Sequence, residues 1–136
     1  MTLMVSGAIP FVALTLMMVM ATPLPLSVSP AIALHLYGVV IASFVAGMHW
    51  GIHFCKRTKD NVYVHTSIIA LVLWCSLLLA GTAAGFAVVL FGFLLLWFEE
   101  YRFSVQRVTT AWFWQTRNRV SAAVVLSLLI AIVLVL

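Results

Sequence analysis

Residues 30–55 read PAIALHLYGVVIASFVAGMHWGIHFC, a run without a single Asp, Glu, Lys or Arg. A helix needs about 20 consecutive apolar residues to cross the hydrocarbon core of a bilayer. Ser29 and Pro30 supply an N-cap and a first-turn proline, which together favour a helix start at this point. The stretch therefore predicts a transmembrane helix.

The composition extends this prediction to the whole chain. Of its 136 residues, 65% are hydrophobic and only 7% are charged, and the mean hydropathy is +1.23. A water-soluble protein of this size does not have enough interior to bury so many apolar side chains. Lys and Arg outnumber Asp and Glu by seven to three, but these charges fall in short loops beside long apolar runs. That pattern is typical of membrane orientation and not of nucleic-acid binding.

Four further apolar runs resemble the first. We predict an all-α integral membrane protein with a single transmembrane helical domain over residues 1–136 and five spans, at about 3–21, 30–55, 63–80, 83–98 and 118–136. Between the last two spans, Tyr101, Val105, Val108 and Trp112 recur at helical spacing. Part of the segment from Glu99 to Arg117 is therefore predicted to be either an interfacial helix on the inner surface or an ordinary loop.

The basic residues predict an orientation. Five spans place the N-terminus, the second loop and the fourth loop on one side, and these two loops hold all seven Lys and Arg residues. Because Lys and Arg concentrate on the inner side of membrane proteins, the N-terminus is expected inside and the C-terminus outside.

A ladder of small residues marks the second span. Ser43, Gly47 and Gly51 recur every four residues, and the last two form a GxxxG motif. Such a face lets another helix approach closely, so helix packing is the simplest interpretation. A binding cleft lined by His49 and Trp50 is the alternative.

Three histidines share the same predicted helix. His35, His49 and His53 fall on one stripe at 100° per residue, and ionisable groups within a membrane usually face the protein interior. They could serve a quinone or proton site, ligate haem, or make hydrogen bonds that only support packing. Haem needs opposing ligands, and His65 is the one other histidine. We therefore expect no haem, no other cofactor and no metal site.

The sequence contains few residues in arrangements that are typical of an enzyme active site. The three carboxylates, Asp60, Glu99 and Glu100, are all predicted at the inner surface, so no acid pair is buried for general acid and base chemistry. The sequence also has no Cys-x-x-Cys motif and no phosphate-binding glycine loop. We expect a protein that is not an enzyme.

A charge cluster is predicted on the inner side. Glu99 and Glu100 close the predicted fourth span and Arg117 and Arg119 open the fifth, so each charge faces the unfavourable end of a helix dipole. A pair between Glu99 or Glu100 and Arg117 would offset this cost. The alternative is that both arginines contact lipid phosphates.

Several short motifs suggest a family. Ile9-Pro10-Phe11, Tyr37-Gly38, Gly47-x-x-Trp50-Gly51 and Trp112-Phe113-x-x-x-Arg117-x-x-x-Ser121 occur in this order. The chain resembles an uncharacterised group of small bacterial and mitochondrial membrane proteins that includes mitochondrial transmembrane protein 69. The resemblance covers most of the chain. It implies a location in the bacterial inner membrane or the mitochondrial inner membrane, and no established activity.

The leading functional hypothesis is a non-enzymatic accessory or assembly subunit of an inner-membrane, respiratory-type complex. It would act by helix packing within the bilayer, on a larger membrane-protein complex or by self-association. One alternative is a small quinone-, haem- or lipid-binding protein that uses the face of His49, Trp50 and His53. Another is a small channel or transporter.

Overall fold

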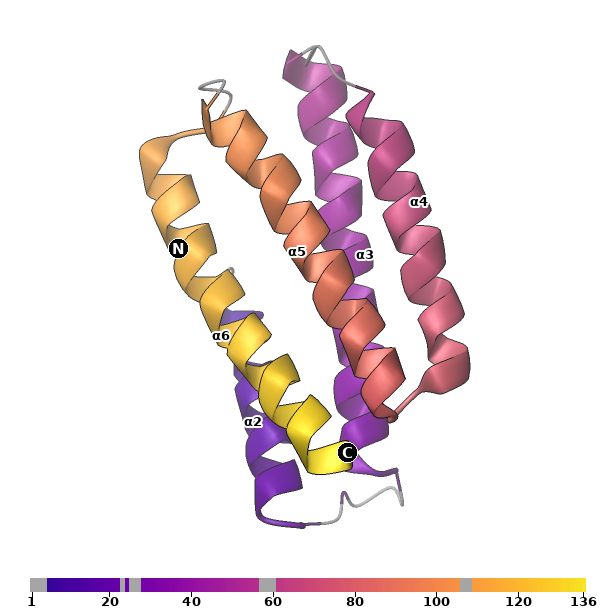
Figure 1. Cartoon of the computed structure of the whole chain (residues 1–136). Coiled ribbons are helices and arrows are strands. Elements are labelled where there is room, and N and C mark those ends of the chain that lie inside the picture. The colour runs from indigo at the N-terminus through magenta and orange to yellow at the C-terminus, as the bar shows by residue number, and fades with distance from the viewer. Residues whose placement is uncertain (1–4, 23, 25–27, 57–60, 106–108) are drawn as a thin grey trace.

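All regular structure in the described residues is helical (Figure 1). The computed structural model describes residues 5–22, 24, 28–56, 61–105 and 109–136. Its elements are α2 (Ile9–Val19), α3 (Pro30–Lys56), α4 (Val62–Cys75), the 3-10 helix η1 (Ser76–Leu79), α5 (Ala83–Val105) and α6 (Ala111–Val135). The all-α prediction is therefore confirmed.

Four helical segments are long and apolar enough to cross a membrane. They are Pro30–Cys55, Val62–Leu79, Ala83–Val105 and Ala111–Val135, close to four of the five predicted spans. The first predicted span differs, because α2 has 11 residues. At 1.5 Å per residue it is about 16 Å long, roughly half of the hydrocarbon thickness.

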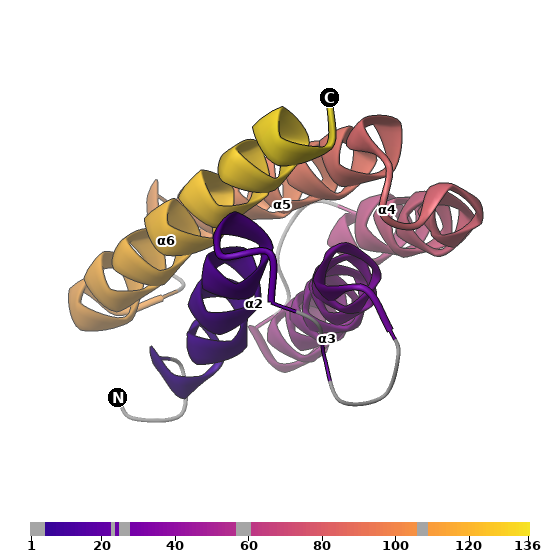
Figure 2. The same ribbon diagram turned by 90° about the horizontal axis from the view of Figure 1, so that it is seen from below.

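The four long helices run alternately up and down, and α2 covers only part of their height (Figure 1). The view from below shows α2 lying against α3 and α6, with α4 on the far side of α3 (Figure 2). Helix α5 is central, since it packs against α3, α4 and α6. Because α2 has 11 residues against 27 in α3 and 25 in α6, it covers only part of the length of these two helices.

Local sequence signals explain where the helices begin. The Ser29 hydroxyl accepts a hydrogen bond from the Ile32 amide at 3.2 Å, which is the N-cap predicted for α3. Thr110 caps α6 in the same way, by accepting from the Phe113 amide. The turn between η1 and α5 contains Gly81 at φ +78°, a conformation that glycine adopts without a steric penalty.

The outer surface carries many large apolar side chains. Fully buried side chains such as Phe11, Leu73 and Phe86 fill the core, yet Phe44 and Leu78 are 75% and 89% exposed. Large exposed hydrophobic side chains occur on all five α-helices. Such an exterior needs an apolar solvent, which supports the prediction that the protein is embedded in a membrane.

The segment between the fourth and fifth predicted spans does not form a separate interfacial helix. Helix α5 continues to Val105 and α6 already begins at Ala111, while Val108 lies outside the described residues. The helical spacing seen in this segment therefore belongs to the ends of two long helices. Helix α5 can continue past its apolar run because its two glutamates have basic partners.

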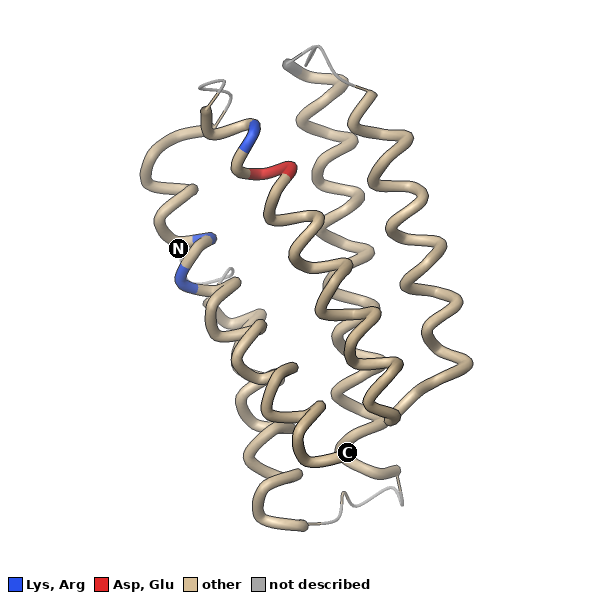
Figure 3. Tube along the Cα trace, in the orientation of Figure 1, with Lys and Arg blue, Asp and Glu red and all other residues tan. Residues whose placement is uncertain are grey.

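The described charged residues gather toward one end of the bundle (Figure 3). This is the end at which α3 and α5 finish and α4 and α6 begin (Figure 1), and we refer to it as the charged end. The opposite end holds the glycine turn before α5. The charge asymmetry of the sequence is thus also an asymmetry in space.

Candidate functional site

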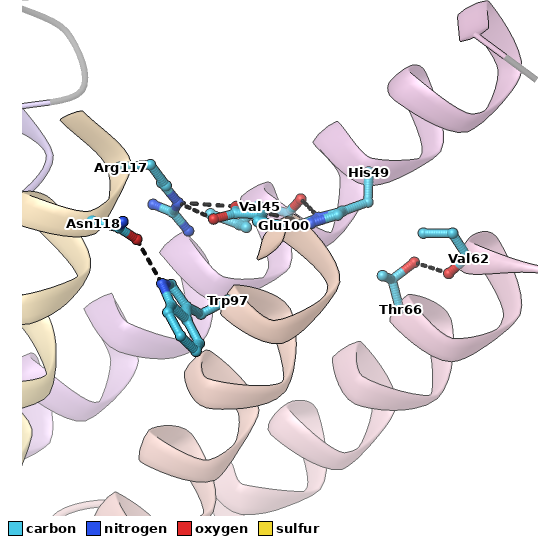
Figure 4. A network of polar contacts seen from close by, with 8 residues as sticks. All are labelled: Val45, His49, Val62, Thr66, Trp97, Glu100, Arg117 and Asn118. Carbon is cyan, nitrogen blue, oxygen red and sulfur yellow. Dashed lines mark hydrogen bonds and ion pairs between the residues drawn. The ribbon is translucent and has the colours of Figure 1, made fainter. Parts of the chain in front are cut away.

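A buried ion pair joins α5 to α6 near the charged end. The Nε of Arg117 donates to both carboxylate oxygens of Glu100, at 2.9 Å to Oε1 and 2.7 Å to Oε2 (Figure 4). Glu100 is 2% exposed and Arg117 is 8% exposed. The predicted pairing is confirmed, and Glu100 is the partner of Arg117. Burial makes each charge depend on the other, because an unpaired charge is costly inside a protein or a membrane.

His49 extends this pair to α3. Its Nδ1 donates to the Val45 carbonyl at 2.7 Å, which leaves Nε2 facing Glu100 Oε1 at 3.8 Å (Figure 4). This separation is too long for a hydrogen bond, and Nε2 has no hydrogen-bond partner among the described residues. In the neutral ring Nε2 is an acceptor, since Nδ1 carries the proton. His49 would attract Glu100 strongly only if Nε2 also took up a proton.

The second glutamate makes a looser set of contacts. Glu99 Oε2 lies 3.3 Å from Arg102 Nη1, one turn along α5, and Oε1 lies 3.5 Å from His65 Nδ1 on α4. The His65 side chain is 52% exposed, so water or lipid headgroups screen this pair. Glu99 and Glu100 thus face different neighbours, although they are adjacent in the sequence.

The dipole argument that motivated the predicted pair does not hold. Because α5 continues to Val105, Glu99 and Glu100 lie before its last turn, where Arg102 is the favourable residue. Arg117 is six positions inside α6, about 9 Å beyond its first residue. The pair exists because both charges are buried, and the helix ends contribute little. Arg119 is exposed.

Neutral hydrogen bonds connect the same helices. Trp97 Nε1 donates to Asn118 Oδ1 at 2.8 Å, a second link between α5 and α6 (Figure 4). On the other side of the bundle, Trp50 Nε1 donates to Thr66 Oγ1 at 3.1 Å and joins α3 to α4. Each link satisfies an indole N–H that would otherwise lie unpaired in apolar surroundings.

The three histidines of α3 pack against two different helices. His35 and His49 are fully buried and pack against Phe86 and Phe103 of α5. His53 packs against Tyr63 of α4, the helix that Trp50 also contacts. His49, Trp50 and His53 therefore do not line one common face. No group of three His, Cys, Asp or Glu residues in the described part of the chain could hold a metal ion.

The predicted ladder of small residues lies on the exposed side of α3. Ser43, Gly47 and Gly51 are exposed, and a Cβ added at either glycine would meet nothing within 4 Å. Within the described chain, therefore, neither glycine brings another helix close. The prediction that Gly47 and Gly51 touch another helix is not met by any helix of the described residues.

Comparison with known families gives one match. Residues 1–133 match the model of a family described as a protein of unknown function, DUF3429. The chain belongs to this family. The match covers nearly the whole sequence, including His49, Glu100 and Arg117. No curated protein and no solved structure matches the chain.

Two hydrogen-bond acceptors of the site, Asn118 and Thr66, could not be identified from the sequence. Asn118 and Thr66 are common residue types near membrane boundaries, and nothing in their spacing identifies Trp97 and Trp50 as their donors. The order of charged residues did indicate that a glutamate meets Arg117. It did not distinguish Glu99 from Glu100, because their positions differ only by rotation about the helix axis.

Proposed function

We propose that this protein is a non-enzymatic accessory or assembly subunit of a larger complex in the bacterial cytoplasmic membrane or the mitochondrial inner membrane. The observation that carries the proposal is the open small-residue face of α3, formed by Ser43, Gly47 and Gly51. We name this surface the small-residue face. Its occupant would be a transmembrane helix of another protein in that complex.

The neighbours of the small-residue face suit a helix as the occupant. Val40, Phe44 and Phe54 are 62%, 75% and 68% exposed and stand on the same helix. Bulky apolar side chains beside glycines make a surface of ridges and a groove, into which another apolar helix can pack. Lipid tails gain no specific contact from a face without side chains. The face has no charged residue, so the partner segment should also be uncharged.

Leucine at position 51 should separate the protein from its complex without unfolding it. An added side chain meets nothing in this chain, but it would fill the groove that the partner needs. We expect Gly51→Leu to lower the amount of protein in the large assembly about tenfold, which corresponds to about 1.4 kcal/mol. Native gel electrophoresis of membranes dissolved in mild detergent would measure this.

Ala87→Leu is the matched control, because Ala87 is an exposed small residue on a different helix, α5. This variant should migrate like the natural protein. Two differently tagged copies, expressed together, test for self-association. If they are recovered as a pair that Gly51→Leu disrupts, the occupant is a second copy and the accessory role is rejected. If Gly51→Leu migrates normally, the small-residue face meets only lipid.

A five-span topology with an inner N-terminus is part of the same proposal. It is supported by the gathering of charges toward one end of the bundle (Figure 3), and it requires the segment containing α2 to cross the membrane despite its short helix. A reporter fused after Leu136 should then behave as external. A cytoplasmic or matrix signal from that fusion would rule out this orientation.

We also propose that the chain is related to the group of membrane proteins that resembles it in sequence. Membership in the group that includes mitochondrial transmembrane protein 69 would be consistent with the inner-membrane location. Fractionation of cells that express a tagged copy would test the location directly, because the protein should be recovered with inner-membrane markers.

A further inference from the structure

A cavity of about 180 Å³ lies between α3, α5, α6 and the beginning of α2. Most of its wall is apolar and includes four phenylalanines, Phe11, Phe44, Phe93 and Phe113. Phe11 and Phe93 are buried, whereas Phe44 is 75% exposed. The cavity therefore reaches from the core to the lipid-facing surface, which gives a membrane-soluble molecule a lateral route of entry. We name it the Arg117 cavity.

Two polar side chains line this cavity, and both can donate hydrogen bonds. The hydrogen bonds from Arg117 to Glu100 use Nε (Figure 4), which leaves the two terminal nitrogens for other partners. They make no hydrogen bond to any residue of the described chain. The hydroxyl of Ser121 is likewise without a partner among the described residues. A molecule that fills the cavity should therefore present hydrogen-bond acceptors.

The spacing of these donors limits the shape of the acceptor group. Arg117 and Ser121 are four positions apart on α6, so their Cβ atoms lie about 5–6 Å apart on one face of the helix. A compact head group with two acceptor oxygens could use both donors. The aromatic side chains around it favour a flat ring, which can stack on their faces or edges.

Charge decides between a neutral and an anionic head group. Glu100 already neutralises Arg117, and both are buried. A second carboxylate or a phosphate would be attracted by Arg117 but repelled by Glu100 at short range, with little solvent screening. In its neutral form His49 adds no charge, because Nε2 then presents a lone pair toward Glu100. The surroundings therefore favour a neutral acceptor over an anion.

We propose that the Arg117 cavity binds the head group of a membrane quinone, with one carbonyl oxygen accepting from Arg117 and another polar oxygen accepting from Ser121. The isoprenoid tail would leave past Phe44 into the bilayer. The proposal concerns binding only and includes no electron transfer. It does not depend on the accessory role, because Ser43, Gly47 and Gly51 do not line the cavity, although Phe44 borders both surfaces.

Decylubiquinone, a short-tailed benzoquinone, is the probe. We expect it to bind purified protein in nanodiscs and to quench the tryptophan fluorescence in a saturable way. Ser121→Ala removes one donor and should weaken binding about fivefold, the effect of one neutral hydrogen bond. Ser121→Leu also fills the cavity and should weaken binding at least tenfold. Arg117 variants are avoided, since loss of the ion pair endangers the fold.

Ser127→Ala is the matched control, because Ser127 is a buried serine of the same helix that does not line the Arg117 cavity. Its affinity should equal that of the natural protein. Equal affinity of Ser121→Leu and the natural protein would overturn the proposal. So would decanoate, which has an anionic head and no ring, competing for the Ser121-dependent site as well as decylubiquinone does, since the occupant would then be a fatty acid.

Discussion

Glu100→Gln should lower the free energy of unfolding by about 3–5 kcal/mol, the cost of removing one partner from a buried ion pair. Glutamine keeps the size of the side chain but leaves the Arg117 charge uncompensated. That charge is 8% exposed and lies six positions inside α6, so it cannot regain full hydration without moving this helix. Unfolding in mixed micelles with increasing SDS would measure the loss.

The neighbouring glutamate is the control for this prediction. Glu99→Gln removes contacts to the partly exposed Arg102 and His65, so we expect a loss of at most about 1 kcal/mol. The double variant Glu100→Gln with Arg117→Gln should recover part of the stability, because no unpaired charge remains. Equal losses for the two glutamates, or a double variant as weak as the sum of the singles, would show that the ion pair is not the cause.

The sequence limits the possible partners of Arg117 to a few residues because it contains few charges. With three acidic residues in the chain and long apolar runs on either side, Arg117 had few possible partners near the same membrane boundary. The same reasoning failed at the helix ends. Apolar run length predicts where a helix leaves the hydrocarbon, but α5 continues past its apolar run to Val105. Hydropathy does not record the charge pairs of Glu99 and Glu100, which lie in the part of α5 beyond its apolar run.

The sequence predicts where helices occur better than it predicts how they pack against one another. The apolar run near the N-terminus predicted a full span, whereas α2 has 11 residues. Because α2 is short, no helix among the described residues covers the α3–α6 side over its whole length, and the Arg117 cavity lies at the beginning of α2, where Gly7 and Phe11 line it. The cavity depends on how residues of four helices meet in space. No pattern along one helix could therefore have revealed that Arg117 and Ser121 share an apolar pocket.

The glycines illustrate the same limit, since their spacing does not show which of them lie in contact with another helix of the same chain. Gly47 and Gly51 are in the recognisable motif but touch no other described helix, while Gly38, Gly85 and Gly92 are buried and Gly85 has the closest neighbours of the three. A Cβ at Gly85 would lie 2.6 Å from His35 Cε1 and would also clash with the Leu79 carbonyl oxygen. His35 cannot easily yield, because its Nε2 is hydrogen-bonded to Ser76 at 3.0 Å.

Gly85→Ala should therefore destabilise the protein by about 2 kcal/mol. Overpacking of this kind costs roughly 1–3 kcal/mol, and here the cost falls at the upper end because one clash is with backbone. Alanine recovers up to about 1 kcal/mol through its better helix propensity. The same SDS unfolding assay applies. Gly47→Ala is the matched control, since its Cβ meets nothing within 4 Å, and it should be neutral or slightly stabilising.

A second variant separates the two clashes at Gly85. His35→Ala removes the ring that lies closest among side chains, so combining it with Gly85→Ala should cost less than the sum of the two single changes. The remaining loss would come from the Leu79 carbonyl oxygen in the turn before α5. Strict additivity would mean that His35 and position 85 do not interact, and that the close approach of α3 to α5 is not what requires glycine there.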